Sequence, residues 1–228
     1  MNQRPIRAVV FDLDGTVIDS LGSHAESFVE LFKLFGKTVS KKKIQSLLRS
    51  PTEEIYSKLH ARQLLDLELE KFLEIRREIY YHLVQTKKMV FPDASVCLRQ
   101  LRKNFKLGLA TNSSRITLNH SVSKPFLKQF DATITFSEVL RPKPNPEMLY
   151  KICRKLAVRP SQCAFVGDSV MDLKAAKRCG MKPIAIYRKT GASRKSELRK
   201  EKPFSLIRDL KKLPAILNQL DSTESSTR

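Results

Sequence analysis

One short segment, residues 9–16, constrains the fold more than any other part of the sequence. It reads Val-Val-Phe-Asp-Leu-Asp-Gly-Thr, so an apolar run leads directly into two carboxylates and a glycine. Such a run is typical of a buried strand that ends in a turn. In open α/β sheets, ligands bind beyond the carboxyl ends of the strands. Asp12 and Asp14 therefore predict a site at this strand end, where they repel each other unless a cation or a proton lies between them.

Segments of strand length and helix length alternate along residues 91–190. Short apolar runs predict strands, and longer segments with apolar residues every three or four positions predict helices. The expected strands are residues 107–110, 133–136, 164–166 and 183–187, and the expected helices are residues 94–104, 145–156 and 170–179. Parallel sheets covered by helices on both faces produce this alternation. With residues 6–11 as a further strand, we predict an α/β fold with a doubly wound, Rossmann-like parallel sheet.

Residues 17–90 show helix patterns and no strand pattern. Ser23, with Glu26 three residues later, forms a capping-box signature for a helix that Gly36 ends. Further helices are expected over residues 40–48, from residue 50 onward, and over residues 66–87. A single preceding strand makes no sheet, so this block is expected to be an inserted helical cap. The predicted core is residues 1–16 and 91–220, and the polar residues 221–228 are expected to be a disordered tail.

The composition favours a globular protein of a reducing compartment. Hydrophobic residues make up 41% of the 228, which is enough for a core and argues against wholesale disorder. The four cysteines are scattered without a C-x-x-C pair, and Cys163 is expected to be a small core residue. The first residues lack a signal-peptide pattern, and no apolar stretch has the length of a membrane span. We therefore expect a cytoplasmic protein without a membrane partner.

The net charge of +20 is large and unevenly distributed. Residues 99–128 contain no acid, and lysines and arginines far outnumber acids in residues 182–212. A solvated basic surface that favours anionic ligands accounts for this pattern, because net charge governs solubility and non-specific binding more than fold. A surface for nucleic acid or another polyanion is the alternative. It is not favoured, because aromatic residues do not interleave the basic runs and no nucleic-acid motif is present.

Four predicted strand ends carry polar residues suited to phosphoryl transfer. They are Asp12 with Asp14, Thr111 with Asn112, Lys143 in the loop after residues 133–136, and Asp168 with Asp172. A parallel sheet brings all these ends to one edge, so residues distant in sequence are expected to converge. A carboxylate there can attack phosphorus, hydroxyl and amide groups can hold the non-bridging oxygens, and a lysine can neutralise negative charge. Several carboxylates together also suit a Mg²⁺ ion.

These motifs resemble those of the haloacid dehalogenase superfamily. Asp12-Leu-Asp14-Gly-Thr16, Thr111-Asn112, Lys143 and Gly167-Asp168-Ser169-x-x-Asp172 occur in that superfamily's order and spacing. Each motif alone is weak, but all four in order on strand ends form a specific pattern. The likeness covers about residues 5–217, and the helical insertion resembles the superfamily's cap of the first type. It is closest to the phosphoglycolate phosphatase and β-phosphoglucomutase-like branch.

The resemblance implies catalytic and metal-binding roles for the carboxylates. Asp12 would be the nucleophile, and Asp14 would protonate the leaving oxygen and then activate the water that hydrolyses an aspartyl-phosphate. Asp12, the backbone carbonyl of Asp14, and Asp168 would bind Mg²⁺. Asp172 would support the metal through a water or a contact with a ligand residue.

The resemblance also implies residues that hold the substrate. Thr111 and Lys143 would hold the phosphate, with Asn112 close by. His24 stands in the first cap helix, where some relatives place a substrate-contacting histidine, and a plain helix-surface histidine is the alternative. Arg49 stands in a cap loop where relatives often have glycine, and it would bind an anionic leaving group or remain a solvated arginine.

The implied activity is Mg²⁺-dependent hydrolysis of a small phosphorylated metabolite, phosphoglycolate-like or a sugar phosphate. Asp14 favours phosphatase or mutase chemistry, because dehalogenases lack a carboxylate there and ion-pumping ATPases carry threonine. One alternative is a sugar-phosphate mutase, which shares every core residue. Gly167 argues against the mutase, because mutase relatives tend to carry an acid there. The other alternative is a basic polyanion-binding or nucleic-acid-binding protein with a vestigial hydrolase site.

Overall fold

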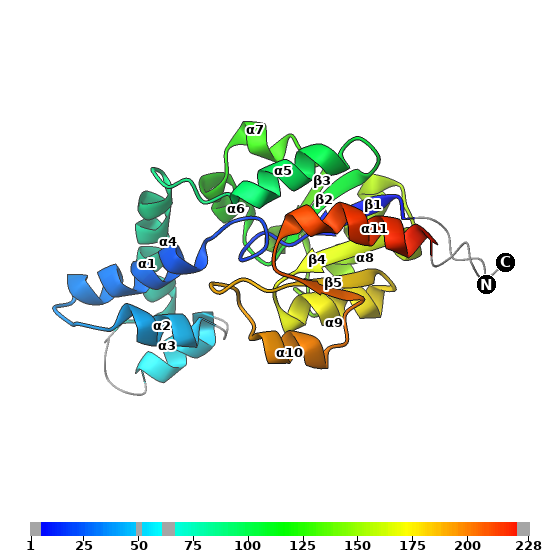
Figure 1. Ribbon diagram of the computed structural model, residues 1–228. Helices are drawn as coiled ribbons and strands as arrows, with labels where there is room; N and C mark the ends of the chain where they lie inside the picture. Colours follow the sequence, from blue (N-terminus) through cyan, green and yellow to red (C-terminus); the bar gives the residue numbers. More distant parts are fainter. Residues whose placement is uncertain (1–5, 49–51, 61–66, 223–228) are drawn as a thin grey trace. The chain divides into compact units, whose positions relative to one another are not determined.

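The computed structural model of the chain describes residues 6–48, 52–60 and 67–222 (Figure 1). The chain divides into two compact units. One unit takes the chain up to Asp19 and from Val90 onward, and the other takes the segment Ser20–Met89. The first unit has an α/β fold, and the second is helical.

Within the described residues, a six-stranded parallel sheet forms the centre of the α/β unit. Its strands are β1 (Ala8–Phe11), β2 (Lys106–Thr111), β3 (Ala132–Thr135), β4 (Cys163–Gly167), β5 (Lys182–Ile186) and β6 (Ser205–Ile207). Their order is β3-β2-β1-β4-β5-β6, and every neighbouring pair is parallel. The doubly wound prediction is therefore confirmed. The strand order reverses between β1 and β4, and such a switch point is where these sheets bind ligands.

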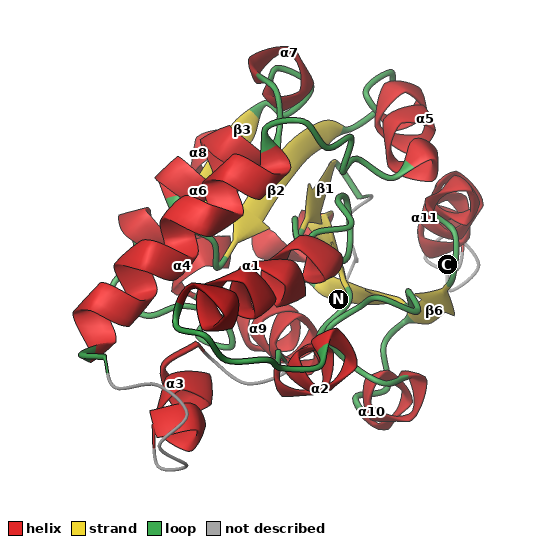
Figure 2. Cartoon of the chain, turned by 90° about the vertical axis from the view of Figure 1, so that its left-hand side faces the viewer, coloured by secondary structure: helices red, strands yellow, loops and turns green. Residues whose placement is uncertain are grey.

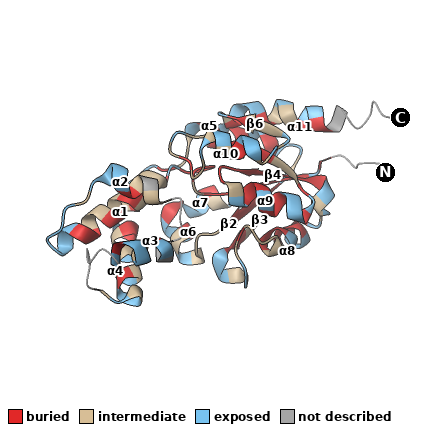
Figure 3. Cartoon of the chain, turned by 90° about the horizontal axis from the view of Figure 1, so that it is seen from below, coloured by how far each residue is buried: buried red, intermediate tan, exposed pale blue. Residues whose placement is uncertain are grey.

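The strand register brings the polar strand ends to one level of the sheet. Phe11, the last residue of β1, pairs with Leu109 of β2 and with Val166 of β4. Both neighbouring strands end within two residues of these partners. Asp12 therefore leaves the sheet beside the carboxyl ends of β2 and β4. Figure 3 shows that the central strands are buried, because helices cover both faces.

Helices pack on the two faces of the sheet. On one face α5 (Pro92–Leu101) contacts α11 (Leu213–Ser222), and on the other α8 (Glu147–Leu156) contacts α9 (Val170–Cys179) (Figure 1). The remaining helices of this unit are α6 (Arg115–Ser121), α7 (Lys124–Leu127) and α10 (Lys195–Lys200), with 3₁₀ turns η1 (Phe136–Glu138), η2 (Pro160–Gln162) and η3 (Leu210–Lys212). Both faces of the sheet are thereby shielded, and its carboxyl edge is left for the site.

The described part of the helical unit contains α1 (Leu21–Leu34), α2 (Lys41–Leu47), α3 (Thr52–His60) and α4 (Leu69–Val84). α1 packs against α2 and α4. Phe28, Phe32 and Phe72 are fully buried between these helices and belong to one apolar cluster. The described residues of this unit include no strand, as the sequence pattern predicts.

Several element boundaries differ from those that the sequence predicts. α1 begins after Ser20, so the capping box predicted at Ser23 is wrong. Ser23 lies buried inside the helix, and its hydroxyl donates to the sulfur of Met89 at 3.9 Å. Packing within the unit thus outweighs the local capping signal. At the other end of the chain, α11 continues to Ser222, so the predicted tail boundary falls inside a helix, and residues 223–228 lie outside the described residues.

The cysteines and the helices also bear on the expectations from composition. Cys97, Cys153, Cys163 and Cys179 are free thiols and are buried. Cys163 in β4 is therefore a core residue, as its apolar surroundings in the sequence predict. Among residues 6–48, 52–60 and 67–222, no helix combines the length and the apolar character that crossing a bilayer requires.

Candidate active site

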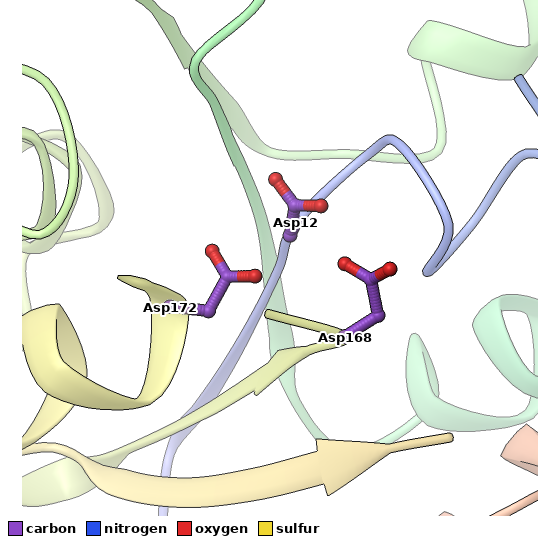
Figure 4. Close-up of side chains that lie close together, drawn as sticks. All are labelled: Asp12, Asp168 and Asp172. Carbon is purple, nitrogen blue, oxygen red and sulfur yellow. The ribbon is translucent and has the colours of Figure 1, made fainter. Parts of the chain in front are cut away.

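Three buried carboxylates meet at the switch point of the sheet (Figure 4). Asp12 follows β1, Asp168 follows β4, and Asp172 lies in the first turn of α9. One carboxylate oxygen from each lies within 4.8 Å of the other two. The register of β1 against β4 produces this convergence, because it places the two strand ends side by side.

The ammonium group of Lys143 lies between two of these carboxylates. Its Nζ donates to Asp12 Oδ1 and to Asp172 Oδ1, both at 2.6 Å, and to the carbonyl oxygen of Ala110 at 3.0 Å. The side chain is 2% exposed, so these contacts are shielded from water. Asn112 holds the lysine's backbone from both sides: its Oδ1 accepts from the Lys143 N–H at 3.0 Å, and its Nδ2 donates to the Lys143 carbonyl at 3.1 Å. The structure therefore gives Asn112 a positioning contact with the lysine loop.

Asp172 is held by the first turn of α9. Ser169 caps this helix, and its N–H and Oγ donate to Asp172 Oδ2 at 3.1 and 2.6 Å. Asp172 Oδ1 accepts from Lys143, so both of its oxygens are occupied by protein donors. A Cβ at Gly167 would lie 2.5 Å from the Asp172 Cβ, so a side chain does not fit before Asp168. This arrangement suits a residue that supports a ligand site and does not itself face the reacting group.

Two glycine-containing loops enclose the carboxylate of Asp168. Its Oδ2 accepts from the backbone N–H of Ala192 at 2.5 Å. A Cβ at Gly15 would lie 2.2 Å from the same oxygen, and one at Gly191 would lie 2.9 Å from it. Gly15 also has a φ of +75°, which L-residues rarely adopt. No pattern in the sequence indicates that Gly191 or Ala192 belongs to the site.

Asp14, two residues after Asp12, has different surroundings. It is half-buried, and its Oδ2 accepts from Ser113 Oγ at 2.7 Å and from Thr111 Oγ1 at 3.5 Å. Thr111 Oγ1 in turn accepts from the Ser113 N–H at 3.0 Å. Asp14 therefore contacts hydroxyl groups, whereas Asp12 contacts an ammonium. Ser113 was not predicted to act at the site, although it belongs to the polar turn after β2.

Burial and mutual repulsion shift the ionisation of this cluster. Burial raises the pKa of Asp12 to about 8, because Lys143 offsets only part of the effect and Asp172 and Asp14 add repulsion. Burial, followed by repulsion from Asp12 and Asp172, raises the pKa of Asp168 well above its ordinary value. Burial alone would lower the pKa of Lys143, but Asp12 and Asp172 outweigh it and raise that pKa above its usual range. The lysine is therefore charged at neutral pH, and it is the one cation among the described residues that forms an ion pair with these carboxylates.

The donor set of this cluster fits a hard divalent cation. Three carboxylates beside one ammonium leave an excess of negative charge when they are ionised. Buried oxygen ligands are the chemistry that Mg²⁺ prefers. Lys143 binds one oxygen of Asp12, and Ala192 binds one oxygen of Asp168. A carboxylate has about four acceptor sites, so both residues keep sites for a cation.

A second ion pair lies outside the carboxylate cluster. Arg188, which follows β5, contacts Asp93 through two hydrogen bonds, Nη1 to Oδ2 and Nη2 to Oδ1, both at 2.9 Å. Its guanidinium carbon lies 3.9 Å from the centre of the Phe91 ring, and Nη2 also donates to the carbonyl of Thr16 at 3.3 Å. Asp93 Oδ2 further accepts from the Leu210 N–H at 2.9 Å. Arg188 therefore links the core segment before the helical unit, through Thr16, to the core segment after it, through Asp93.

The two substrate residues predicted in the helical unit have different outcomes. His24 is half-buried in α1, and its ring stacks on Tyr80 with centroids 4.2 Å apart and an interplanar angle of 7°. This contact lies within the helical unit and gives the histidine a packing role. Arg49 lies outside the described residues. A substrate contact by either residue stays a prediction.

The family of the chain follows from a match across its motifs. A sequence profile described as haloacid dehalogenase-like hydrolase matches residues 9–186, from β1 to the end of β5. This span contains all four strand-end motifs. The chain belongs to the haloacid dehalogenase-like hydrolase family. The fold, with its reversal of strand order between Asp12 and Asp168, agrees with this assignment.

Curated relatives of this hydrolase carry phosphatase names. Human N-acylneuraminate-9-phosphatase is 27% identical over 239 residues, which cover 95% of each chain. A Clostridium perfringens protein provisionally named pyrophosphatase PpaX is 29% identical over 216 residues, which cover 91% of this chain and 99% of the relative. The similarity therefore extends over the α/β unit and the helical insertion in both relatives.

Solved structures show the same fold. CbbY from Rhodobacter sphaeroides, solved in complex with phosphate, matches with a TM-score of 0.79 at 21% identity, over 93% of this chain and 99% of that one. A hydrolase of the same superfamily from Geobacter sulfurreducens matches with a TM-score of 0.73 at 22% identity, over 93% and 96%. These matches confirm the predicted α/β architecture of this hydrolase.

Proposed function

We propose that this hydrolase is a Mg²⁺-dependent phosphatase that cleaves a small phosphomonoester through an aspartyl-phosphate on Asp12. The proposal rests on one observation, the different surroundings of two carboxylates that follow the same strand. Asp12 is buried against Lys143 and lies beside Asp168, whereas Asp14 is half-buried among hydroxyl groups. Two carboxylates with such different surroundings suit two different roles, nucleophile and acid/base.

Asp12 provides the nucleophile in this proposal. Lys143 holds its Oδ1, which leaves the second oxygen to attack phosphorus. The attack forms the bond between Asp12 and phosphorus and breaks the bond between phosphorus and the leaving oxygen. The ammonium stabilises the ionised carboxylate before the attack, which matters because burial alone favours the protonated form.

Asp14 moves the proton in both halves of the reaction. It protonates the leaving oxygen in the first step and then accepts a proton from the water that releases the phosphoryl group from Asp12. Ser113 orients its carboxylate through the 2.7 Å hydrogen bond, and the hydroxyl of Thr111, which lies 3.5 Å from the same carboxylate, would hold a phosphoryl oxygen.

The carboxylate cluster is proposed to hold Mg²⁺. Asp12, the backbone carbonyl of Asp14, and Asp168 would be the ligands, and the bound cation would stabilise negative charge on the phosphoryl oxygens. Asp172 supports this site from behind, because both of its oxygens are taken by Lys143 and Ser169. Lys143 contacts Asp12 and would also hold the phosphate, and Asn112 keeps the lysine in place.

The steric surroundings of Gly167 favour the phosphatase over the sugar-phosphate mutase. A Cβ there would lie 2.5 Å from the Asp172 Cβ, so this chain has no room for the acid that mutases tend to carry. The products separate the two activities directly, because a phosphatase releases orthophosphate and a mutase leaves the phosphate on the sugar. Incubating the protein with a hexose 1-phosphate and measuring both products distinguishes them.

A substrate panel tests the proposed function. The names of the relatives suggest pyrophosphate and N-acylneuraminate 9-phosphate as its first members, together with phosphoglycolate and sugar phosphates. We expect release of orthophosphate with Mg²⁺ and loss of that release with a chelator. Asp12→Asn should abolish the release, whereas Asp19→Asn, in an exposed residue of the same segment, should leave it unchanged. Substantial activity in the folded Asp12→Asn protein would contradict the proposal.

A further inference from the structure

A groove of about 480 Å³ lies at the free edge of the sheet in the α/β unit. It is lined by β6 and by residues of α10 and α11. β6 ends the strand order and pairs with β5 on its inner side, and Figure 2 shows it between α10 and α11. The groove shares no lining residue with the carboxylate cluster described above.

Among the described residues that line this groove, four are cations and none is an acid. Lys195 and Arg199 come from successive turns of α10, and Arg208 and Lys212 follow β6. Within the described residues, none of the four forms a salt bridge with an acid. Repulsion from Arg199, and then from Arg208, lowers the pKa of Lys195 below its ordinary value. The groove therefore carries a concentrated positive charge that the protein does not neutralise.

The acids nearest in sequence have other partners. Glu197 accepts from the Arg194 N–H at 2.6 Å, and Asp209 accepts from the Lys211 N–H at 2.8 Å. Glu201 lies 3.8 Å from the ammonium of Lys174 and 3.6 Å from that of Lys177, both on α9. Each of these acids is thus used elsewhere, which leaves the groove cations available to an anion from outside.

Most of the other lining residues are apolar. Leu206 and Ile207 of β6 line one part of the groove, and Ala215 and Ile216 of α11 line another. A simple inorganic anion would leave this apolar surface exposed to water, and a purely apolar ligand would leave the cations without a partner. The two features together suit a ligand with several negative charges at one end and a flat apolar body at the other.

We propose that this groove binds an organic polyphosphate of the nucleoside di- or triphosphate class. The two arginines and two lysines would contact the phosphates, since guanidinium groups bind phosphate oxygens in pairs and ammonium groups add point charges. The base would lie against the apolar surface of β6 and α11. The groove volume lies within the range of small-molecule sites, about 300–1,000 Å³. An acidic peptide added to the sheet edge is less suited, because β6 has only three residues to pair with it.

ATP is the probe, and tripolyphosphate and adenosine represent its two halves. Binding to the full chain is measured by isothermal titration at physiological ionic strength, with a chelator present to prevent hydrolysis. The test variant is Arg199→Gln/Arg208→Gln, which removes two charges from the groove. The matched control is Lys124→Gln/Lys128→Gln, which removes the same charge from exposed residues at α7 in the same unit.

ATP should bind the wild-type protein and the control with affinities within about twofold, and the groove variant should bind at least about tenfold more weakly, because two charge-assisted contacts are lost. Tripolyphosphate and adenosine should each bind more weakly than ATP. Hydrolysis of an aryl phosphate with Mg²⁺ should be equal in all three proteins, which shows that the variants are folded.

Four results would overturn the proposal. Equal ATP affinity in the groove variant and the wild type would show that ATP binds outside the groove. Complete displacement of ATP by orthophosphate would show that ATP binds at the active site instead. Tripolyphosphate binding as tightly as ATP would show that the apolar surface takes no part. A polyglutamate peptide that binds more tightly than ATP, and loses affinity in the groove variant, would assign the groove to an acidic protein segment.

Discussion

Gly15→Ala should lower the activity of the carboxylate site by more than its effect on the stability of the fold explains. The new Cβ would lie 2.2 Å from Asp168 Oδ2, more than 1 Å inside normal contact distance. Asp168 cannot easily move away, because its Oδ2 accepts from the Ala192 N–H at 2.5 Å and lies against Gly191 on the other side. Either the carboxylate or the loop after β1 must therefore shift by about 1 Å, a displacement that can cost about 100-fold in rate.

Backbone strain at Gly15 requires its own control, because its φ is +75°. An alanine in this region of φ costs about 1–2 kcal/mol. Gly180, which ends α9, has a φ of +83°, and a Cβ there would meet nothing within 4 Å. Gly180→Ala therefore carries a comparable backbone penalty without touching the site.

The assay compares these two variants in stability and in rate. Urea unfolding should show a loss of about 1–2 kcal/mol in Gly180→Ala, and a larger loss in Gly15→Ala, because the clash with Asp168 adds to the backbone strain. Steady-state hydrolysis of an aryl phosphate should stay near wild type in Gly180→Ala and fall about 100-fold in Gly15→Ala, with a higher Mg²⁺ requirement. If the two variants have equal rates, the close packing of the turn at Gly15 against Asp168 is not required for activity.

Four further predictions concern the α/β unit and the basic surface of the protein. A double-mutant cycle of Asp93→Asn and Arg188→Gln should give a coupling of about 1–3 kcal/mol in the free energy of unfolding. The reason is that both side chains are only 12% exposed and the contact between them is bidentate. Additive effects of the two substitutions would contradict this prediction. Burial alone raises the pKa of Asp93, but Arg188 together with the hydrogen bonds from the Leu210 N–H and Asp209 outweighs burial and lowers that pKa. The stabilisation that this shift provides is therefore present above about pH 4 and is lost as the pH falls further, except in Asp93→Asn. Ser113→Ala should lower kcat for an aryl phosphate about tenfold, since a hydrogen bond to the Asp14 carboxylate is lost. Ser114→Ala, which removes the cap of α6, should reduce only the stability of the protein. Equal rates in the two variants would contradict the role of Ser113. A duplex oligonucleotide should not bind at physiological ionic strength, and binding that weakens steeply with salt would instead support the polyanion surface.

The convergence of the strand ends could be predicted from the sequence because its physical cause is local. Each strand is a short apolar run that ends at a glycine or a polar residue, and parallel strands align such ends at one edge. Asp12 and Asp168 are 156 positions apart, yet the observed pairing of β1 with β4 puts them side by side as expected. The resemblance to a known family then supplied roles that these patterns alone do not contain.

Other parts of the site could not be predicted because their signals are not local. The Ala192 N–H that binds Asp168 is a backbone group, and every residue except proline carries one. Ser113 looks like any turn serine until the fold places Asp14 beside it. Asp93 is an ordinary acid in the first turn of α5, and its partner Arg188 lies 95 residues further along the chain.

Local signals also misled where tertiary contacts were stronger. Ser23 and Glu26 form a good capping signature, yet the helix begins after Ser20, because Ser23 is buried and contacts Met89. β6 is only three residues long, which is too short to show a reliable alternation. Its place at the sheet edge comes from pairing with β5, and this pairing also creates the basic groove.

In the proposed reaction, Asp12 carries the phosphoryl group during turnover. Borohydride reduces acyl phosphates to alcohols, so quenching the reaction with it converts a phosphorylated aspartate into homoserine, which mass spectrometry of the peptides locates. We predict homoserine at position 12 when substrate and Mg²⁺ are present, and none there when substrate is omitted. An enzyme that turns over substrate yet shows homoserine at position 14, or none at either position, would contradict the account.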